Sequence, residues 1–269
     1  MKYNPMTFKP MLMPPPGLEI HSSKRHLPLM AGIKVFRDQV KNKLIKNSGF
    51  SSTLHNKKFI FARIPKNAST SLCGAIFGRE YDAKWPSHVS AEYYRNIWPS
   101  FYEGALVFAA IRHPYDRLRS AFNYYKFKTN VPEERNFMDE NLLFLKDFED
   151  FLAYLDNMKK IESVPIMRWH HFRKQTDFIC SVRGDVIVDI LFPVENMRDG
   201  LQVVGKYMER KLNVPYDNAS GLDSQSNEFP NSVVSYFKED LQLWNAVYKS
   251  GIIHPKIGSY ILTDASNFR

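Results

Sequence analysis

Three short apolar runs constrain the fold of this chain more than any other feature. They span residues 59–64, 105–111 and 186–192 and hold almost no charge. Such runs fit strands buried on both faces of a parallel sheet. Apolar residues recur at helical spacing over residues 69–77, 115–127, 148–158, 197–212 and 232–248. This alternation predicts an α/β fold, in which ligands bind beyond the carboxyl ends of the strands.

The first strand-to-helix junction has the sequence PKNASTSL at residues 65–72. Asn67, Ser69, Thr70 and Ser71 suit a helix start, where free N–H groups bind anions. Lys66 adds a full positive charge beside them. The junction predicts a phosphate or sulfate site. A capped surface helix with an incidental lysine is the alternative. A glycosylation sequon at Asn67 is also present, but no secretory signal accompanies it.

The second junction places Arg112 at a strand end and Ser120 two turns into the following helix, which Pro114 suits as a first-turn residue. Arginine binds phosphate well because its planar fork contacts two oxygens. Arg112 and Ser120 therefore predict a second phosphate site. The alternative is that Arg112 and Arg117 form structural ion pairs, for example with Asp116.

Together, the two junctions resemble the donor-binding motifs of the family 2 sulfotransferases, which include carbohydrate sulfotransferases. The resemblance implies a P-loop-like three-layer fold with a central, mostly parallel sheet flanked by helices. It implies that 3′-phosphoadenosine-5′-phosphosulfate (PAPS) is the co-substrate and that no metal is needed. The motif at residues 65–72 would bind the 5′-phosphosulfate, and Arg112 and Ser120 would bind the 3′-phosphate. The implied donor-binding residues are Lys66, Asn67, Ala68, Ser69, Thr70, Ser71, Arg112 and Ser120.

Two further stretches resemble the same family. HFRKQTDFIC at residues 171–180 is similar to a segment that contains histidine and glutamine and ends in cysteine, although Lys174 stands where proline is common. VDILFPVENMR at residues 188–198 is similar to the strand and glutamate-containing turn that follow. The similarity covers most of residues 57–248, so we expect a catalytic domain over residues 57–269.

Between the two donor motifs lies His88, where the family often places a histidine. The resemblance makes His88 the candidate general base and Lys66 the residue that stabilises charge on the leaving phosphate. An imidazole near its ordinary pKa can take a hydroxyl proton at neutral pH. The expected acceptor is a hydroxyl compound, with a carbohydrate as its class. A helix-start histidine without catalytic duty is the alternative.

The formal charge of +9 lies entirely in the N-terminal part of the chain. Residues 1–58 hold eleven Lys and Arg against two acidic residues, whereas residues 59–269 hold 26 of each sign. We expect a Pro- and Met-rich extension over residues 1–56, with a short basic amphipathic helix over residues 31–46. This helix is expected either to dock on the catalytic domain with its lysine face in solvent, or to make peripheral contact with a membrane surface or an acidic glycan. No nucleic-acid partner is expected for the catalytic domain.

No signal peptide, transmembrane run or disulfide framework is apparent, which favours a soluble or cytoplasmic protein. Two other functions stay open: a nucleotide-dependent P-loop kinase or hydrolase, and a non-enzymatic anion-binding module. Two further patterns resemble functional motifs, a nucleotide-binding loop and a metal site, but we expect neither function from them. Residues 200–207 nearly match a Walker A motif but fall within a helical pattern. His170 and His171 should point apart on a regular element, which argues against a metal site with Cys180.

Overall fold

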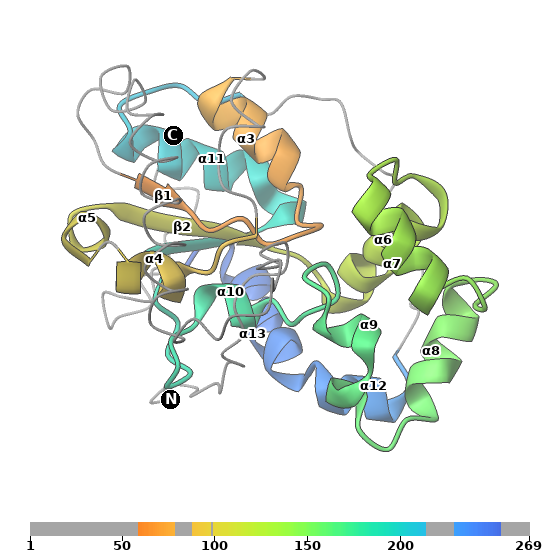
Figure 1. Ribbon diagram of the computed structural model, residues 1–269. Helices are drawn as coiled ribbons and strands as arrows, with labels where there is room; N and C mark the ends of the chain where they lie inside the picture. The colour runs from red at the N-terminus through yellow and green to blue at the C-terminus, as the bar shows by residue number, and fades with distance from the viewer. Residues whose placement is uncertain (1–58, 79–87, 98, 214–228, 254–269) are drawn as a thin grey trace, which may run out of the picture.

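The computed structural model describes residues 59–78, 88–97, 99–213 and 229–253 (Figure 1). The predicted helix over residues 31–46 and the rest of the N-terminal extension lie outside these ranges. The domain division at residues 56 and 57 therefore stays a prediction. Among the described helices, none combines the length and the apolar character that crossing a membrane would require.

A three-stranded parallel sheet forms the centre of the fold. Its strands are β1 (Phe59–Phe61), β2 (Leu106–Ile111) and β3 (Ile190–Pro193), in the order β1-β2-β3. Phe59 pairs with Leu106, and Phe108 pairs with Ile190. Every strand residue is buried, which explains why the three runs are apolar. The predicted α/β fold with a parallel sheet is confirmed.

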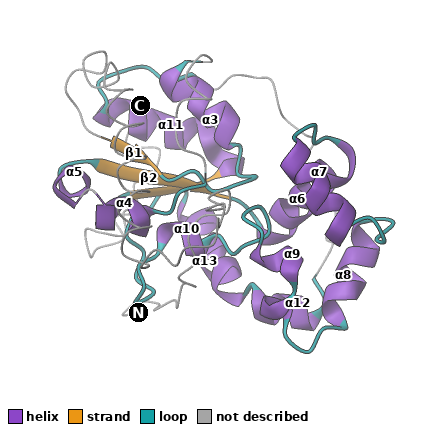
Figure 2. Ribbon diagram, in the orientation of Figure 1, coloured by secondary structure: helices purple, strands orange, loops and turns teal. Residues whose placement is uncertain are grey.

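Helices cover both faces of the sheet and make three layers (Figure 2). On one face lie α3 (Ser69–Phe77) and α11 (Met197–Tyr207), which pack with Phe61, Phe108 and Phe192 in one core. On the other lie α4 (Ala91–Ile97), α5 (Pro99–Glu103), α10 (Thr176–Ile179) and α13 (Lys238–Ser250). Alternate strand residues feed the two cores because successive side chains of a strand point to opposite faces.

A helical lobe packs beside the sheet around a third core, which is rich in aromatic residues. It contains α6 (Pro114–Phe127), α7 (Pro132–Asn141), α8 (Phe148–Asp156), the 3-10 turn Ile161–Ser163, α9 (Pro165–Arg168) and α12 (Asn231–Tyr236). Rings such as Phe122 and Phe151 stack at 5.5 Å. Helix α6 follows β2 after two residues, so it begins at the edge of the sheet and extends into the lobe.

Most of the predicted elements are present, with differences in their bounds. Strand β1 ends at Phe61, three residues before the end of the predicted run. Strand β3 begins four residues late, because Val186 instead bridges antiparallel to Cys180. The predicted helix over residues 197–212 ends at Tyr207. The helix over residues 232–248 is divided at Phe237, since α12 packs into the core of the lobe and α13 packs against the sheet. The short helices α4, α5, α7, α9 and α10 were not predicted.

The Walker A-like stretch lies inside α11, as expected, and its two glycines serve packing. A Cβ atom on Gly200 would lie 2.3 Å from the ring of Phe192, and one on Gly205 would lie 2.5 Å from the carbonyl oxygen of Arg210. These glycines therefore let α11 approach the sheet and its own C-terminal turn closely, rather than cradle a phosphate.

Gly200→Ala should lower the free energy of unfolding by about 1–3 kcal/mol, because the new methyl group overpacks against Phe192. Equilibrium urea unfolding measures the change. Gly74→Ala is the matched control: it is also a helix glycine, but its added Cβ meets nothing within 4 Å. It should raise stability by roughly 0.5–1 kcal/mol. Equal effects at both positions would contradict the packing argument.

Candidate active site

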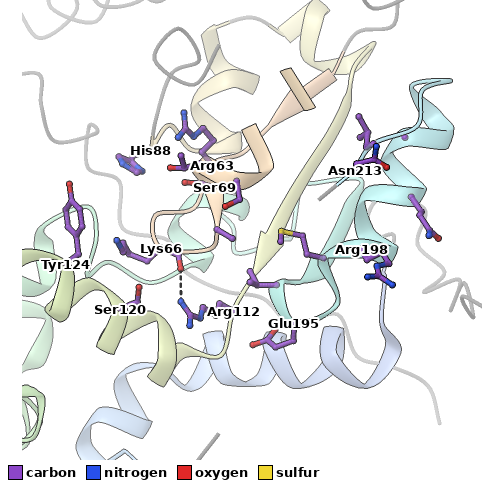
Figure 3. A pocket seen from close by; sticks show the side chains of 18 of the residues that line it. Arg63, Lys66, Ser69, His88, Arg112, Ser120, Tyr124, Glu195, Arg198 and Asn213 are labelled. Carbon is purple, nitrogen blue, oxygen red and sulfur yellow. Dashed lines mark hydrogen bonds between the residues drawn. The ribbon is translucent and has the colours of Figure 1, made fainter. Parts of the chain in front are cut away.

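A cavity of about 1620 Å³ opens at the carboxyl ends of β1 and β2. Its lining brings together both junctions and the predicted base: Lys66, Ala68, Ser69, Thr70, Ser71, His88, Arg112 and Ser120. In Figure 3, His88, Lys66 and Tyr124 lie on one side of the first junction, and Arg198 and Asn213 lie on the other. Residues more than 50 positions apart in sequence thus share one space.

The first junction is a tight turn with unusual backbone angles. Lys66 and Ala68 both have positive φ, 65° and 52°, which is uncommon without glycine and is concentrated at functional sites. Ala68 is the N-cap of α3, and no side chain caps the helix. The first N–H groups of α3 therefore stay available to an anion. The alternative expectation for this junction was a helix capped by a side chain, and α3 has no such cap.

Asn67 does not line the cavity, in contrast to its predicted neighbours. Its side chain is 1% exposed, and its Nδ2 donates to Ala110 O at 2.8 Å and to Gln175 Oε1 at 2.7 Å. The side chain ties the turn to strand β2, so the predicted contact of Asn67 with the donor would have to come from its backbone. The same burial removes Asn67 as a glycosylation acceptor.

Arg112 follows directly after β2 and turns its guanidinium toward the first junction. Its Nη1 donates to Lys66 O at 3.4 Å, as the dashed line in Figure 3 shows. Burial lowers its pKa, yet an arginine stays charged. Ser120 lines the cavity from α6. The two residues predicted to hold a second phosphate therefore face the same space as Lys66.

Gln175 links the two junctions, and composition and spacing do not reveal this role. The side chain is fully buried, with Oε1 accepting from Arg112 N at 3.0 Å and Nε2 donating to Arg112 O at 2.9 Å. Asp240 fixes Gln175 in turn, since its Oδ2 accepts from Gln175 N at 2.7 Å. In the sequence, the importance of Gln175 is indicated only by the resemblance of residues 171–180 to a glutamine-containing segment of the family.

Arg117 supports the first junction rather than the ligand. Its side chain is 1% exposed, with Nε donating to Pro65 O at 2.9 Å and Nη1 donating to Arg173 O at 2.6 Å. Burial lowers its pKa to about 10, against an opposing effect of Asp240. The predicted pairing of Asp116 with Arg112 or Arg117 was wrong, because Asp116 pairs with Arg119 at 3.3 Å.

His88 meets two further histidines at the cavity wall. Its ring stacks on His170 at 4.8 Å and meets His171 edge-on at 4.9 Å. Burial lowers the pKa of His88 well below 6.5, and His170 and Arg63 lower it further. The expectation of an unperturbed imidazole was therefore wrong. His88 is instead a neutral imidazole across the neutral pH range.

His170 and His171 do not point apart, because they lie in a turn after α9 rather than on a regular element. One nitrogen from each of His88, His170 and His171 lies within 4.8 Å of the others. Among the residues that the structure describes, these three histidines are the group whose spacing could hold a metal ion. Cys180 is buried in the sheet core instead. The surroundings oppose a cation, since Arg63 and Lys66 act on His88 as positive charges.

Lys66 rests on an aromatic platform that sequence reasoning missed. Its Nζ lies 3.9 Å from the centroid of the Tyr124 ring, and Tyr124 Oη donates to Glu134 Oε2 at 2.8 Å. Burial lowers the pKa of Lys66 to about 8, and Glu134 opposes that shift. The lysine is therefore a partly desolvated cation that responds to pH close to neutrality.

A model of the sulfotransferase family matches residues 52–246 of this chain. The chain belongs to the sulfotransferase family. The match covers both junctions, His88 and the segment around Gln175, so the resemblance to family 2 is confirmed. No curated protein and no solved structure matches the chain. Membership assigns this sulfotransferase to enzymes that transfer sulfuryl groups.

Binding of inorganic sulfate to this sulfotransferase should weaken by roughly tenfold or more between pH 7 and pH 9. Lys66 has a lowered pKa of about 8, so its positive charge is present below that pH and is lost as the pH rises through it. Isothermal titration across this range measures the dissociation constant. Lys66→Arg is the control and should flatten the profile, because arginine keeps its charge. A flat wild-type profile would contradict the assignment.

Proposed function

We propose that this sulfotransferase moves a sulfuryl group from PAPS to a hydroxyl of a carbohydrate acceptor. One observation carries the proposal: an uncapped helix N-terminus with Lys66, an arginine at the next strand end and a neutral histidine face a single cavity. The first two features suit the two anionic ends of the donor. The histidine suits a proton acceptor.

The donor would lie across both junctions. The N–H groups at Ser69, Thr70 and Ser71, together with Lys66, would hold the 5′-phosphosulfate. Arg112 and Ser120 would hold the 3′-phosphate. Support comes from the short link between these groups, because Arg112 already reaches Lys66 O at 3.4 Å. Two sites this close suit one ligand that carries two phosphates.

In the proposed reaction, the acceptor oxygen forms a bond to sulfur as the bond from sulfur to the phosphate oxygen breaks. The leaving phosphate keeps the electron pair, and His88 takes the hydroxyl proton. Positioning and electrostatic stabilisation dominate loose transfers of this kind, by analogy with phosphoryl transfer. Lys66 would stabilise the charge that grows on the leaving phosphate.

The acceptor would occupy the part of the cavity beside His88. That part is lined by Tyr124, Lys128, Glu134 and His171, which offer donors, acceptors and an aromatic face. The cavity of about 1620 Å³ exceeds the usual range of about 300–1000 Å³ for small-ligand sites. The excess supports a cavity that holds an acceptor beside the donor. The basic N-terminal residues would guide an acidic glycan or bind a membrane surface, as a separate function.

A P-loop kinase or hydrolase is less well supported. Such enzymes hold Mg²⁺ with a hydroxyl residue and a carboxylate. Among the described residues that line the cavity, the carboxylates are Glu134, Glu195 and Glu209. Glu134 already accepts from the hydroxyls of Tyr124 and Thr129. We therefore retain sulfuryl transfer as the function that the site supports best.

Titration with 3′-phosphoadenosine 5′-phosphate tests the donor assignment. Wild-type protein should bind it, and Arg112→Ala should weaken binding by roughly 10- to 100-fold, since a charge-assisted phosphate contact is lost. Arg119→Ala is the control, because Arg119 pairs with Asp116 and does not line the cavity. Unchanged binding in Arg112→Ala would contradict the 3′-phosphate site. Donor binding without transfer of labelled sulfate to any acceptor would favour an anion-binding module.

His88→Ala should lower kcat by about 10²–10⁴ if His88 is the general base. Donor binding should change little, because the residue lies on the acceptor side of Lys66 (Figure 3). Labelled-sulfate transfer measures kcat, and the nucleotide titration provides the control for folding. Near-wild-type turnover in this variant would remove His88 from the mechanism.

A further inference from the structure

A chain of buried hydrogen bonds leads to His171, which the proposed mechanism does not use. Trp169 Nε1–H donates to Tyr125 Oη, and Tyr125 Oη is bonded to His171 Nδ1. Tyr125 is 1% exposed and His171 is 6% exposed. The chain joins α6 to the turn after α9, and it ends at a histidine on the cavity wall.

The direction of this chain follows from the chemistry of its members. Tryptophan can only donate, so the Tyr125 oxygen accepts from Trp169. The Tyr125 hydroxyl then has one hydrogen to place, and within the described part of the chain its other partner is His171 Nδ1. Buried hydroxyl groups are rarely left unpaired. Tyr125 therefore donates to His171 Nδ1, and the neutral imidazole carries its hydrogen on Nε2.

The Nε2–H group of His171 is a hydrogen-bond donor beside the proposed base. His171 and His88 meet at 4.9 Å between ring centroids, and nitrogens of the two rings lie within 4.8 Å of each other. One oxygen can bridge two nitrogens at this separation, because each hydrogen bond spans about 2.6–3.2 Å. A bridging hydroxyl that accepts from His171 must place its own hydrogen elsewhere, and His88 is the neighbouring acceptor.

We propose that His171 binds the oxygen of the acceptor hydroxyl through Nε2–H and so directs the hydroxyl hydrogen to His88. Tyr125 and Trp169 are positioning residues that fix the tautomer of His171. The proposal rests on the proposed function, in which His88 accepts the proton while the acceptor oxygen bonds to sulfur. The donors then run in one direction, from Trp169 through Tyr125, His171 and the hydroxyl to His88.

The same tautomer argues against a metal ion in the histidine trio. A metal ligand must offer a nitrogen lone pair. The Nδ1 lone pair of His171 is occupied by the Tyr125 hydroxyl, and Nε2 carries a hydrogen. The stacked rings of His88 and His170 lie nearly parallel, with an angle of 27° between their planes. The three histidines are therefore arranged to donate and accept hydrogen bonds rather than to coordinate a cation.

Nitrogen NMR of the histidine side chains, in the full chain without donor or acceptor, tests the tautomer directly. Wild-type His171, assigned through loss of its signals in His171→Gln, should show hydrogen on Nε2 and none on Nδ1. Tyr125→Phe should move the His171 Nδ1 signal toward that of a nitrogen whose lone pair accepts no hydrogen bond. The matched control is Tyr94→Phe, which removes another buried tyrosine hydroxyl that has no hydrogen-bond partner among the described residues. Its His171 spectrum should match the wild type.

The NMR result separates this proposal from the proposed function. Hydrogen on Nδ1 of wild-type His171 would overturn the proposal even if the protein transfers sulfate. Wild-type protein that shows Nε2–H but transfers no sulfate to hydroxyl acceptors would overturn the proposed function, and with it the role of His171, while leaving the tautomer established. An unchanged Nδ1 signal in Tyr125→Phe would overturn the positioning role of Tyr125.

Acceptor kinetics test the contact itself. His171→Leu should lower kcat/KM for the acceptor by roughly 10- to 100-fold, chiefly through KM, because one hydrogen bond to the hydroxyl is lost. His171→Gln, whose amide N–H reaches close to the Nε2 position, should recover part of that loss. Binding of 3′-phosphoadenosine 5′-phosphate should stay within about twofold in both variants, which reports an intact fold. Wild-type acceptor kinetics in His171→Leu would overturn the proposal.

Discussion

The side-chain amide of Gln175 is the interaction on which the site depends. Through three hydrogen bonds it joins Asn67 in the first junction to both backbone groups of Arg112 in the second. Each junction alone is a local strand-to-helix turn. The amide fixes the distance between them, so the two anion-binding groups become one site. Because Asp240 holds the backbone of Gln175, the C-terminal helix α13 also helps to set that distance.

The sequence alone was sufficient to predict what local chemistry determines. Buried parallel strands need unbroken apolar runs, and an anion site at a helix start needs residues that are adjacent in the chain. The structural role of Arg117 was not predictable, because Arg112 and Arg117 belong to the same junction and only the packed fold shows that Arg117 is the buried one. The meeting of His88 with His170 and His171 depends on an irregular turn, for which periodicity gives no signal.

The cavity concentrates positive charge in a chain segment that is neutral overall. Lys66 and Arg112, which line the cavity, have lowered pKa values because burial disfavours their charged forms. An anion that enters relieves this cost and binds only the folded state. Ligands of that kind stabilise a fold by a free energy that grows with the logarithm of their concentration over their dissociation constant. The buried cations that are disfavoured in the empty cavity would thus favour the binding of an anion.

The left-handed turn at Lys66 and Ala68 has a consequence for how a donor is captured. Many phosphate-binding loops rely on glycine, whose broad conformational range must narrow when the ligand binds. Here side-chain-bearing residues occupy the rare conformation, and buried hydrogen bonds from Asn67 and Arg117 keep it in place. The ordering cost is met during folding. The turn therefore behaves as a rigid template, and the amide groups at the start of α3 are aligned before any ligand binds.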